Sequence, residues 1–258
     1  MALRRFFISP EQLTDPNPSL WGDEARHLLK VLRLGVGEEV ILFDNSGLEY
    51  RSRIRSVSRD KVVFDIEEKE RINRESPLRI SLGLPLIRSQ PLEWILQKGT
   101  ELGVSSFYPF YSAHSSRNFQ KREQEIRMNR WQKIVQEAAK QCRRNMLPAV
   151  HPMISFIDLL EIGQEGLKII LHQEATERTM RALYAGPSFP GSVFLLVGPE
   201  GGFPPEEVNL AERKEFISLS LGPRILRSET AALALISLCQ FLWGDMGAEK
   251  KGGEDAVS

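Results

Sequence analysis

Residues 78–111 constrain the fold most, because they contain one complete strand, helix and strand. Leu78–Leu84 is an apolar run of strand length, and Ser89 is suited to cap the helix that follows. Gly103 ends the helical pattern, and 104–111 is a second apolar strand. A strand–helix–strand unit of this length joins neighbouring parallel strands. The sequence therefore predicts an α/β domain built on a parallel sheet.

Three further strands are predicted in the second half of the chain, at 167–171, 192–197 and 215–219. Two of them run into turns built on Gly-Pro, at Gly198-Pro199 and Gly222-Pro223. Glycine allows the backbone to approach a ligand closely, and such turns expose N–H and C=O groups at a strand end. Two turns of this kind predict one shared binding pocket.

The N-terminal part differs in character. Residues 22–33 have the spacing of a short helix, and 40–43 with the run from Leu48 form a predicted hairpin. Residues 67–77 are charged, end in Pro77 and are expected to be a linker. The predicted organisation is a small β-rich domain at 1–75, an α/β domain at 76–244 and a disordered tail at 245–258.

Composition and missing motifs exclude several classes. No apolar stretch is long enough for a membrane span, and the N-terminus lacks the pattern of a secretory signal. Two isolated cysteines, Cys142 and Cys239, fit a reducing cytoplasm and no metal site. The dinucleotide-binding glycine fingerprint, the Walker A loop and the Gly-x-Ser-x-Gly elbow are all absent.

Basic residues are concentrated at 117–144, although the formal net charge of the chain is zero. This segment holds nine Lys or Arg against three Glu, an excess of six positive charges. Such an excess favours phosphate contact over a merely solvated helix face. Arg51, Arg53 and Arg55 also share one strand face, for which a solvated surface and an RNA-facing stripe remain equal alternatives.

The last predicted helix begins at Ser228, and its sequence to Trp243 is apolar on almost every side. A helix of this kind must be covered all round. The domain's own sheet covers one side, so a second copy of the chain is the natural cover for another. The sequence therefore predicts a homodimer.

The two Gly-Pro motifs also carry a resemblance. Gly198-Pro199-Glu200-Gly201-Gly202, together with the run from Leu221 to Ala231, resembles the small-subunit rRNA uridine N3-methyltransferase family of the SPOUT (trefoil-knot) superfamily. The resemblance extends over nearly all of the chain except the tail. Its other motifs are Gln97 to Val104, Arg130 to Ile134, Glu137-Ala138-Ala139, Gln141, His27-Leu28, Val31-Leu32-Arg33 and Arg5-Phe6-Phe7.

This resemblance implies a PUA-like β-barrel for residues 1–75 and a deeply knotted SPOUT domain for 76–244. It implies S-adenosyl-L-methionine as methyl donor, a homodimer, and methylation at N3 of one uridine in the decoding region of 16S rRNA, in the 30S subunit (U1498 in that family). The donor pocket that it implies is formed by three stretches: the loop after strand 167–171, the run from Val197 to Gly202 and the run from Leu219 to Leu226. The residues singled out in these stretches are Leu171, His172, Val197, Gly198, Pro199, Glu200, Gly201, Gly202, Leu219, Leu221, Gly222, Ile225 and Leu226.

The chemistry requires that the proton on uridine N3 leaves before or during methyl transfer. Arg227 is the candidate for stabilising negative charge on the uracil, and Glu229 or Glu200 for accepting the proton. Each glutamate also has a purely structural explanation. Glu229 lies in the first turn of a helix, where the helix dipole favours a carboxylate, and Glu200 could stabilise its loop through a hydrogen bond. Phosphate contacts are expected from Arg5, Arg33, Arg117, Arg130 and Arg144.

Two alternatives remain open from the sequence. A knotted methyltransferase could act on another RNA, such as tRNA, or on a ribose 2′-hydroxyl. A non-catalytic RNA-binding or ribosome-assembly protein would keep the basic surface but bind no methyl donor.

Overall fold

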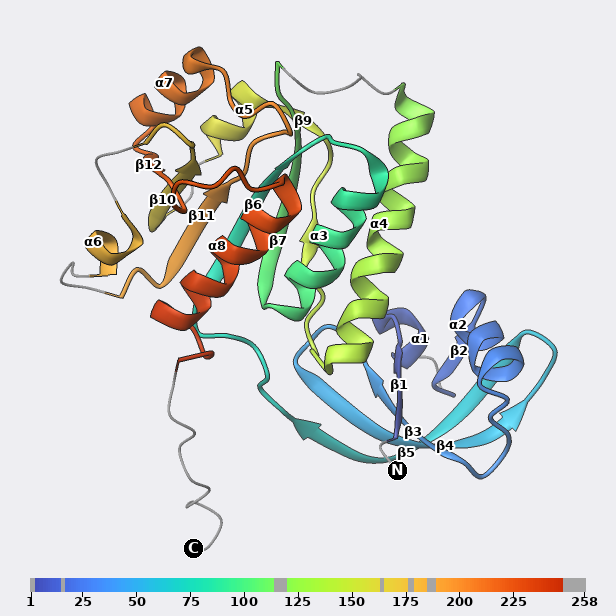
Figure 1. Cartoon of the computed structure of the whole chain (residues 1–258). Coiled ribbons are helices and arrows are strands. Elements are labelled where there is room, and N and C mark those ends of the chain that lie inside the picture. The colour runs from blue at the N-terminus through green and yellow to red at the C-terminus, as the bar shows by residue number, and fades with distance from the viewer. Residues whose placement is uncertain are drawn as a thin grey trace, which may run out of the picture. The chain divides into compact units, whose positions relative to one another are not determined.

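The computed structural model describes residues 3–14, 17–113, 120–162, 165–175, 179–184 and 189–247 (Figure 1). The chain divides into two compact units. Unit 1 comprises Met1–Glu75 and Gln136–Leu147, and unit 2 comprises Ser76–Val135 and Pro148–Ser258. The return of 136–147 to unit 1 is a feature that the domain boundaries predicted from sequence do not contain. Arg117 and most of the predicted tail, 248–258, lie outside the described residues.

Unit 1 is built on a five-stranded sheet in the order β1-β3-β4-β5-β2. The β1–β3 pair is parallel and the other pairs are antiparallel. Inward-facing side chains such as Phe6, Leu42 and Phe64 are fully or almost fully buried in its core. The elements are β1 (Arg4–Phe7), α1 (Pro10–Thr14), β2 (Ser19–Trp21), α2 (Asp23–Arg26), the π-helical η1 (His27–Val31), β3 (Glu39–Phe43), β4 (Leu48–Val57) and β5 (Lys61–Arg71).

Two sequence predictions in unit 1 are corrected. The helix expected at 22–33 is a turn of α-helix followed by a π-helix, and it ends before Arg33, whose φ is 55°. The linker expected at 67–77 is strand β5 as far as Arg71. Charged residues continue this strand because they pair across it: Arg53 Nε lies 2.6 Å from Glu67 Oε1.

The row of strand β4 arginines is accounted for by the same cross-strand pairing. Arg51 and Arg53 both bind Glu39, at 2.7 and 2.6 Å, and Arg55 lies 3.3 Å from Asp65. These side chains are exposed and balanced by carboxylates. Of the two alternatives drawn from the sequence, the arrangement supports the solvated, charge-balanced face.

Unit 2 contains a seven-stranded sheet in the order β12-β10-β11-β6-β7-β8, with β9 also paired to β7. Every pair is parallel. The elements are β6 (Arg79–Pro85), α3 (Ser89–Glu101), β7 (Val104–Tyr111), α4 (Lys121–Cys142), β8 (Ala149–Val150), β9 (Ile154–Ser155), α5 (Phe156–Glu161), β10 (Leu167–Leu171), α6 (Met180–Tyr184), β11 (Ser192–Leu196), α7 (Pro205–Arg213), β12 (Ile217–Leu219) and α8 (Ser228–Trp243). Helix α4 belongs to unit 2 as far as Val135 and to unit 1 from Gln136 on.

Both faces of this sheet are covered by helices, because successive apolar side chains of the central strand β11 point to opposite faces and both sets are buried. Val193 and Leu195 belong to the core on the α3 and α8 side, whereas Phe194 and Leu196 belong to the core on the α5 and α7 side. Figure 1 shows these helices as two layers with the strands between them. The predicted α/β class with a parallel sheet is therefore confirmed.

None of the described helices has both the length and the apolar character needed to cross a membrane.

Candidate functional site

A cavity of about 620 Å³, counting its mouth, lies where three neighbouring strands of unit 2 end. Strands β10, β11 and β12 are adjacent and parallel, so their carboxyl ends meet at one edge of the sheet. The loops that leave β11 and β12 form the walls. The lining residues are Leu171, His172, Gln173, Val197, Gly198, Pro199, Glu200, Gly202, Leu219, Ser220, Leu221, Gly222, Arg224, Ile225, Leu226, Ser228 and Ala231.

The two Gly-Pro loops therefore meet, as the sequence predicts. Of the thirteen positions implied as donor-binding, only Gly201 is not part of the lining, and it lies between two residues that are. The lining also contains Gln173, Ser220 and Arg224, which were not singled out but lie within the predicted loop after 167–171 and the predicted run from Leu219 to Leu226. Sequence reasoning missed Ser228 and Ala231 as lining residues. Both lie in the first turn of α8, directly after the second loop, so proximity in the chain was the available signal.

Glycine is required at several points of the cavity wall. Gly202 and Gly222 have φ of 72° and 107°, values that side-chain-bearing residues rarely adopt. Gly198 is needed for space, since a Cβ there would lie 3.1 Å from Cδ2 of the buried Phe203. These constraints leave bare backbone at the cavity, where peptide groups can approach a ligand.

Hydrogen bonds join the walls to one another. The backbone N–H of His172 donates to the carbonyl of Leu219 at 3.0 Å, which ties the end of β10 to the end of β12. The hydroxyl of Ser228 donates to the carbonyl of Gly198 at 2.8 Å, which ties the start of α8 to the loop after β11. The cavity is thus assembled from three chain segments that are held together directly.

The three candidate catalytic residues are placed differently. Glu200 lines the cavity and is exposed, whereas Arg227 and Glu229 do not line it. Arg227 is exposed at the N-cap position of α8, and Glu229 is half-buried in the first turn of that helix. A second guanidinium, that of Arg224, is exposed and does line the cavity.

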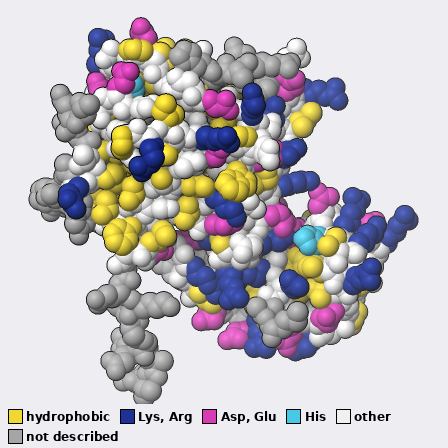
Figure 2. Space-filling model, in the orientation of Figure 1, with side chains coloured by type: hydrophobic (Ala, Val, Ile, Leu, Met, Phe, Trp, Pro, Cys, Tyr) yellow, Lys and Arg dark blue, Asp and Glu magenta, His cyan; other side chains and the backbone are white. Residues whose placement is uncertain are grey.

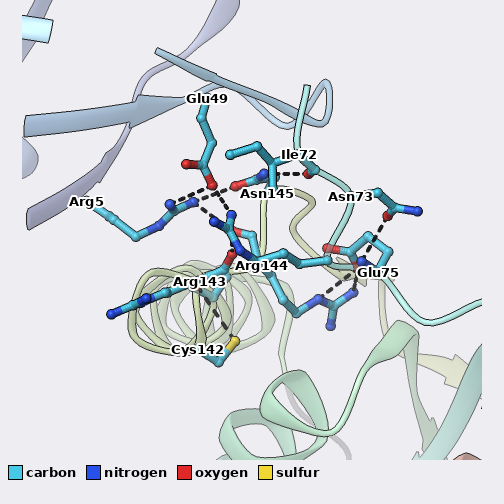
Figure 3. A network of polar contacts seen from close by, with 11 residues as sticks. Arg5, Glu49, Ile72, Asn73, Glu75, Cys142, Arg143, Arg144 and Asn145 are labelled. Carbon is cyan, nitrogen blue, oxygen red and sulfur yellow. Dashed lines mark hydrogen bonds and ion pairs between the residues drawn. The ribbon is translucent and has the colours of Figure 1, made fainter. Parts of the chain in front are cut away.

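Two arginines expected to contact RNA are instead buried in unit 1 (Figure 3). Arg5, with a side chain only 7% exposed, donates to Glu49 at 2.7 Å and to Asn145 Oδ1 at 2.5 Å. Arg144, also 7% exposed, lies 2.5 Å from Glu75. Both charges are neutralised by carboxylates from distant parts of the chain, so the prediction that they contact phosphate is corrected.

Burial also affects the ionisation of this network. It lowers the pKa of the Arg5 guanidinium from its ordinary value, although the hydrogen bond and charge of Glu49 oppose that change. Burial alone would raise the pKa of Glu49, but hydrogen bonds from Arg5 and Arg74 and their charges outweigh it, so this pKa is lowered. The network is charged and structural.

Two of the other arginines predicted to contact RNA, Arg33 and Arg130, have exposed side chains. Arg33 is exposed in unit 1. Arg130 in α4 is 65% exposed, with one nitrogen 2.7 Å from Glu93. Among the residues that the structure describes, no group of three or more His, Cys, Asp or Glu side chains is arranged to hold a metal ion.

Comparison with known proteins agrees with this geometry. The model of the RNA methyltransferase domain matches residues 74–240, and that of the RNA methyltransferase PUA domain matches residues 20–67. The ribosomal RNA small subunit methyltransferase E of Bacillus subtilis is 35% identical over 247 residues, which cover 93% of this chain and 96% of that protein.

Solved structures give the same result. A protein of Legionella pneumophila, solved in complex with bound SAM, has a TM-score of 0.89 and 33% identity, and the match covers 95% of this chain and 100% of that one. The ribosomal RNA small subunit methyltransferase E of Neisseria gonorrhoeae, bound to S-adenosyl methionine, has a TM-score of 0.83 and 31% identity, with 95% and 100% covered.

A parallel α/β unit with a glycine-walled cavity at its strand ends, in one chain with a PUA domain, defines an RNA methyltransferase. The predicted class and the PUA-like N-terminal unit are thereby confirmed. The chain belongs to the ribosomal RNA small subunit methyltransferase E family.

Proposed function

We propose that this chain transfers a methyl group from S-adenosyl-L-methionine to N3 of one uridine in the decoding region of 16S rRNA, acting on the 30S subunit. The observation that carries the proposal is the single cavity formed by the two Gly-Pro loops, 198–202 and 221–226. Membership of the family and the cofactor named for two solved relatives support the same donor.

The residues of the cavity fit this donor. Apolar side chains offer surfaces for an aromatic ring, and the glycine-rich backbone offers peptide groups at short range for the edge of a purine. The apolar lining consists of Leu171, Val197, Leu219, Leu221, Ile225, Leu226 and Ala231.

The donor supplies an electrophilic methyl group, and the protein must prepare the nitrogen that receives it. Loss of the N3 proton leaves negative charge shared with the uracil oxygens. We assign stabilisation of that charge to Arg227, with Arg224 as the neighbouring guanidinium that lines the cavity. Glu200 and Glu229 are the candidate proton acceptors, and Glu200 is favoured because it reaches the cavity wall.

For RNA, exposed Arg33 and Arg130 are the proposed phosphate contacts, together with Arg117, which the structure does not describe. Such contacts orient the substrate, while the target base leaves its stack to reach the cavity. A trefoil knot is part of the proposal, supported by strand order, in which β10 lies between β11 and the later β12.

We also propose a homodimer that covers the outer side of α8. Phe241 and Leu238 are 62% and 37% exposed, and Trp94 on the adjacent α3 is 53% exposed. Figure 2 shows hydrophobic side chains gathered over this part of unit 2. An apolar surface of this kind is typical of a subunit interface.

The test combines donor binding with mapping of the product. Titration calorimetry with S-adenosylhomocysteine should give saturable binding, and reaction with 30S subunits lacking the modification should place one methyl group on N3 of the uridine. Arg227→Ala should abolish turnover while binding survives, and Arg213→Ala, an exposed arginine at the end of α7, should change neither. Methylation of tRNA instead of 30S subunits, or full turnover by Arg227→Ala, would contradict the proposal.

A further inference from the structure

Ser228 forms the direct side-chain link between the two loops of the cavity. It is the first residue of α8, only 4% exposed, and part of the cavity lining. Its hydroxyl donates to the carbonyl of Gly198 at 2.8 Å, across 30 residues of sequence. The bond joins the helix that follows the second loop to the first residue of the first loop.

This use of the hydroxyl differs from the ordinary one. A serine at a helix start usually accepts a hydrogen bond from a backbone N–H of the first turn. In α8 the capping position belongs to Arg227, and no side chain caps the helix. The single hydrogen of the Ser228 hydroxyl is donated to the carbonyl oxygen of Gly198, so Ser228 acts as a donor to the first loop.

Gly198 is also packed closely against a buried ring. The ring of Phe203 lies so close that a Cβ on Gly198 would be 3.1 Å from Cδ2 and 3.3 Å from Cε2. Phe203 is 5% exposed and packs against Phe110 and Phe156 in the second core. Residue 198 therefore contacts a buried aromatic cluster of its own core and accepts a hydrogen bond from Ser228 at the start of α8.

We propose that Ser228 is a positioning residue that sets the separation of the two loops and thereby the affinity for the methyl donor. This inference rests on the proposed function of the same cavity. Without the hydroxyl, the Gly198 carbonyl loses its partner and the first loop gains alternative positions. The donor then binds only the fraction of molecules with the loop in place, so the apparent affinity falls by that fraction.

The experiment compares two side chains of nearly equal shape, Ser228→Thr and Ser228→Val. Threonine keeps the hydroxyl and valine replaces it with a methyl group, so any crowding by the added carbon is common to both. Calorimetry with S-adenosylhomocysteine should give affinity within about threefold of the native protein for Ser228→Thr. For Ser228→Val it should be about 5- to 30-fold weaker, the usual range for one buried hydrogen bond.

Two further readouts separate positioning from general stability. Amide hydrogen exchange should accelerate at 198–202 in Ser228→Val and stay unchanged in strands β6 and β7. With 30S subunits, KM for the donor should rise while KM for the RNA stays the same. Ser192→Ala is the control, because its hydroxyl also donates to a backbone carbonyl, that of Glu165 at 2.7 Å, but Ser192 is not part of the cavity lining.

Equal affinities for the valine and threonine variants would overturn the inference. If Ser228→Val does not fold, Ser228→Ala is compared with Ser228→Thr under the same criterion. Failure of the native protein to bind S-adenosylhomocysteine is a separate result, since it would refute the proposed function before any variant is compared.

Discussion

Substituting Glu49 with Gln tests whether the arginines near it serve the fold instead of RNA. The Glu49 side chain is 8% exposed and forms ion pairs with Arg5, at 2.7 Å, and with Arg74. A neutral amide leaves these two guanidinium groups facing each other without their shared counter-charge. Both guanidinium groups donate to the same oxygen, Oε1, so an amide oxygen there can keep the two hydrogen bonds, and what the substitution removes is the negative charge.

The size of the effect follows from burial. Removing one partner of a buried ion pair costs about 3–5 kcal/mol. Glutamine keeps one acceptor oxygen, so about 2–4 kcal/mol is expected for Glu49→Gln. With a urea dependence of about 2 kcal/mol per molar, the unfolding midpoint of unit 1 should fall by about 1–2 M.

Hydrogen exchange measured across a urea series resolves the two units, because peptides from β4 and β5 report on unit 1 and peptides from β6 on unit 2. Glu39→Gln is the matched control: Glu39 also pairs with two arginines, Arg51 and Arg53, but these arginine side chains are 49% and 43% exposed and Glu39 itself is 23% exposed. The control should leave the midpoint unchanged. Equal midpoints for the Glu49 and Glu39 variants would refute the structural role assigned to the network.

The same residue predicts a pH dependence. The folded pKa of Glu49 is lowered, since the two arginines outweigh burial, so the unfolded chain binds its proton more readily. Its stabilising contribution is complete above the unfolded pKa of about 4.3 and is lost as the pH falls through the folded pKa. Acid unfolding of unit 1 should therefore depend less steeply on pH in Glu49→Gln, and an unchanged slope would count against this origin.

Three other predictions follow from single contacts. Gly198→Ala places a Cβ 3.1 Å from the buried Phe203 ring and should weaken S-adenosylhomocysteine binding more than about tenfold, whereas Gly35→Ala, with 3.9 Å to its nearest neighbour, should not. Glu207, 8% exposed, accepts from Ser112 Oγ at 2.7 Å and from the Ala113 N–H at 2.8 Å. In urea unfolding, Glu207→Ala should lower the unfolding free energy of unit 2 by about 2–4 kcal/mol. Glu206→Ala, at the exposed neighbouring position, should lower it by less than about 1 kcal/mol, and equal losses for the two variants would contradict this prediction. Arg33→Gln should reduce the slope of the logarithm of RNA affinity against the logarithm of salt concentration by about one. Arg5→Gln should leave this slope unchanged, because the charge of Arg5 is already neutralised by Glu49 in the native protein.

Local pattern was sufficient for most of the elements of unit 2. The period-two alternation that sorts Val193 and Leu195 from Phe194 and Leu196 reflects which face of a strand is buried. Glycine and proline at 198–199 and 222–223 marked turns because few other residues adopt the required backbone angles. The cavity was predicted for this reason, and its glycines lie in the wall.

Local pattern misjudged elements whose stability comes from partners across a sheet. The acidic run from Glu67 has the composition of a linker, yet it continues β5 because arginines of β4 lie opposite. The helix at 22–33 ends early, since its last turn is π-helical and Arg33 takes a left-handed conformation. The hydrophobic periodicity of a segment shows neither which strand will lie opposite it nor which of its residues will adopt a left-handed conformation.

What the sequence alone determined is most of the longer strands and helices of unit 2 and the two motifs that border the cavity, because each depends on residues close in the chain; the short elements β8, β9, α5 and α6 were not predicted. Only the tertiary structure decided that β10 lies between β11 and β12, so that the loops meet. It also decided which charges are available: Arg5 and Arg144 are neutralised by Glu49 and Glu75, 44 and 69 residues away. A charge binds a ligand or stabilises the fold according to the partner that folding brings to it, and that partner is set by contacts between distant segments.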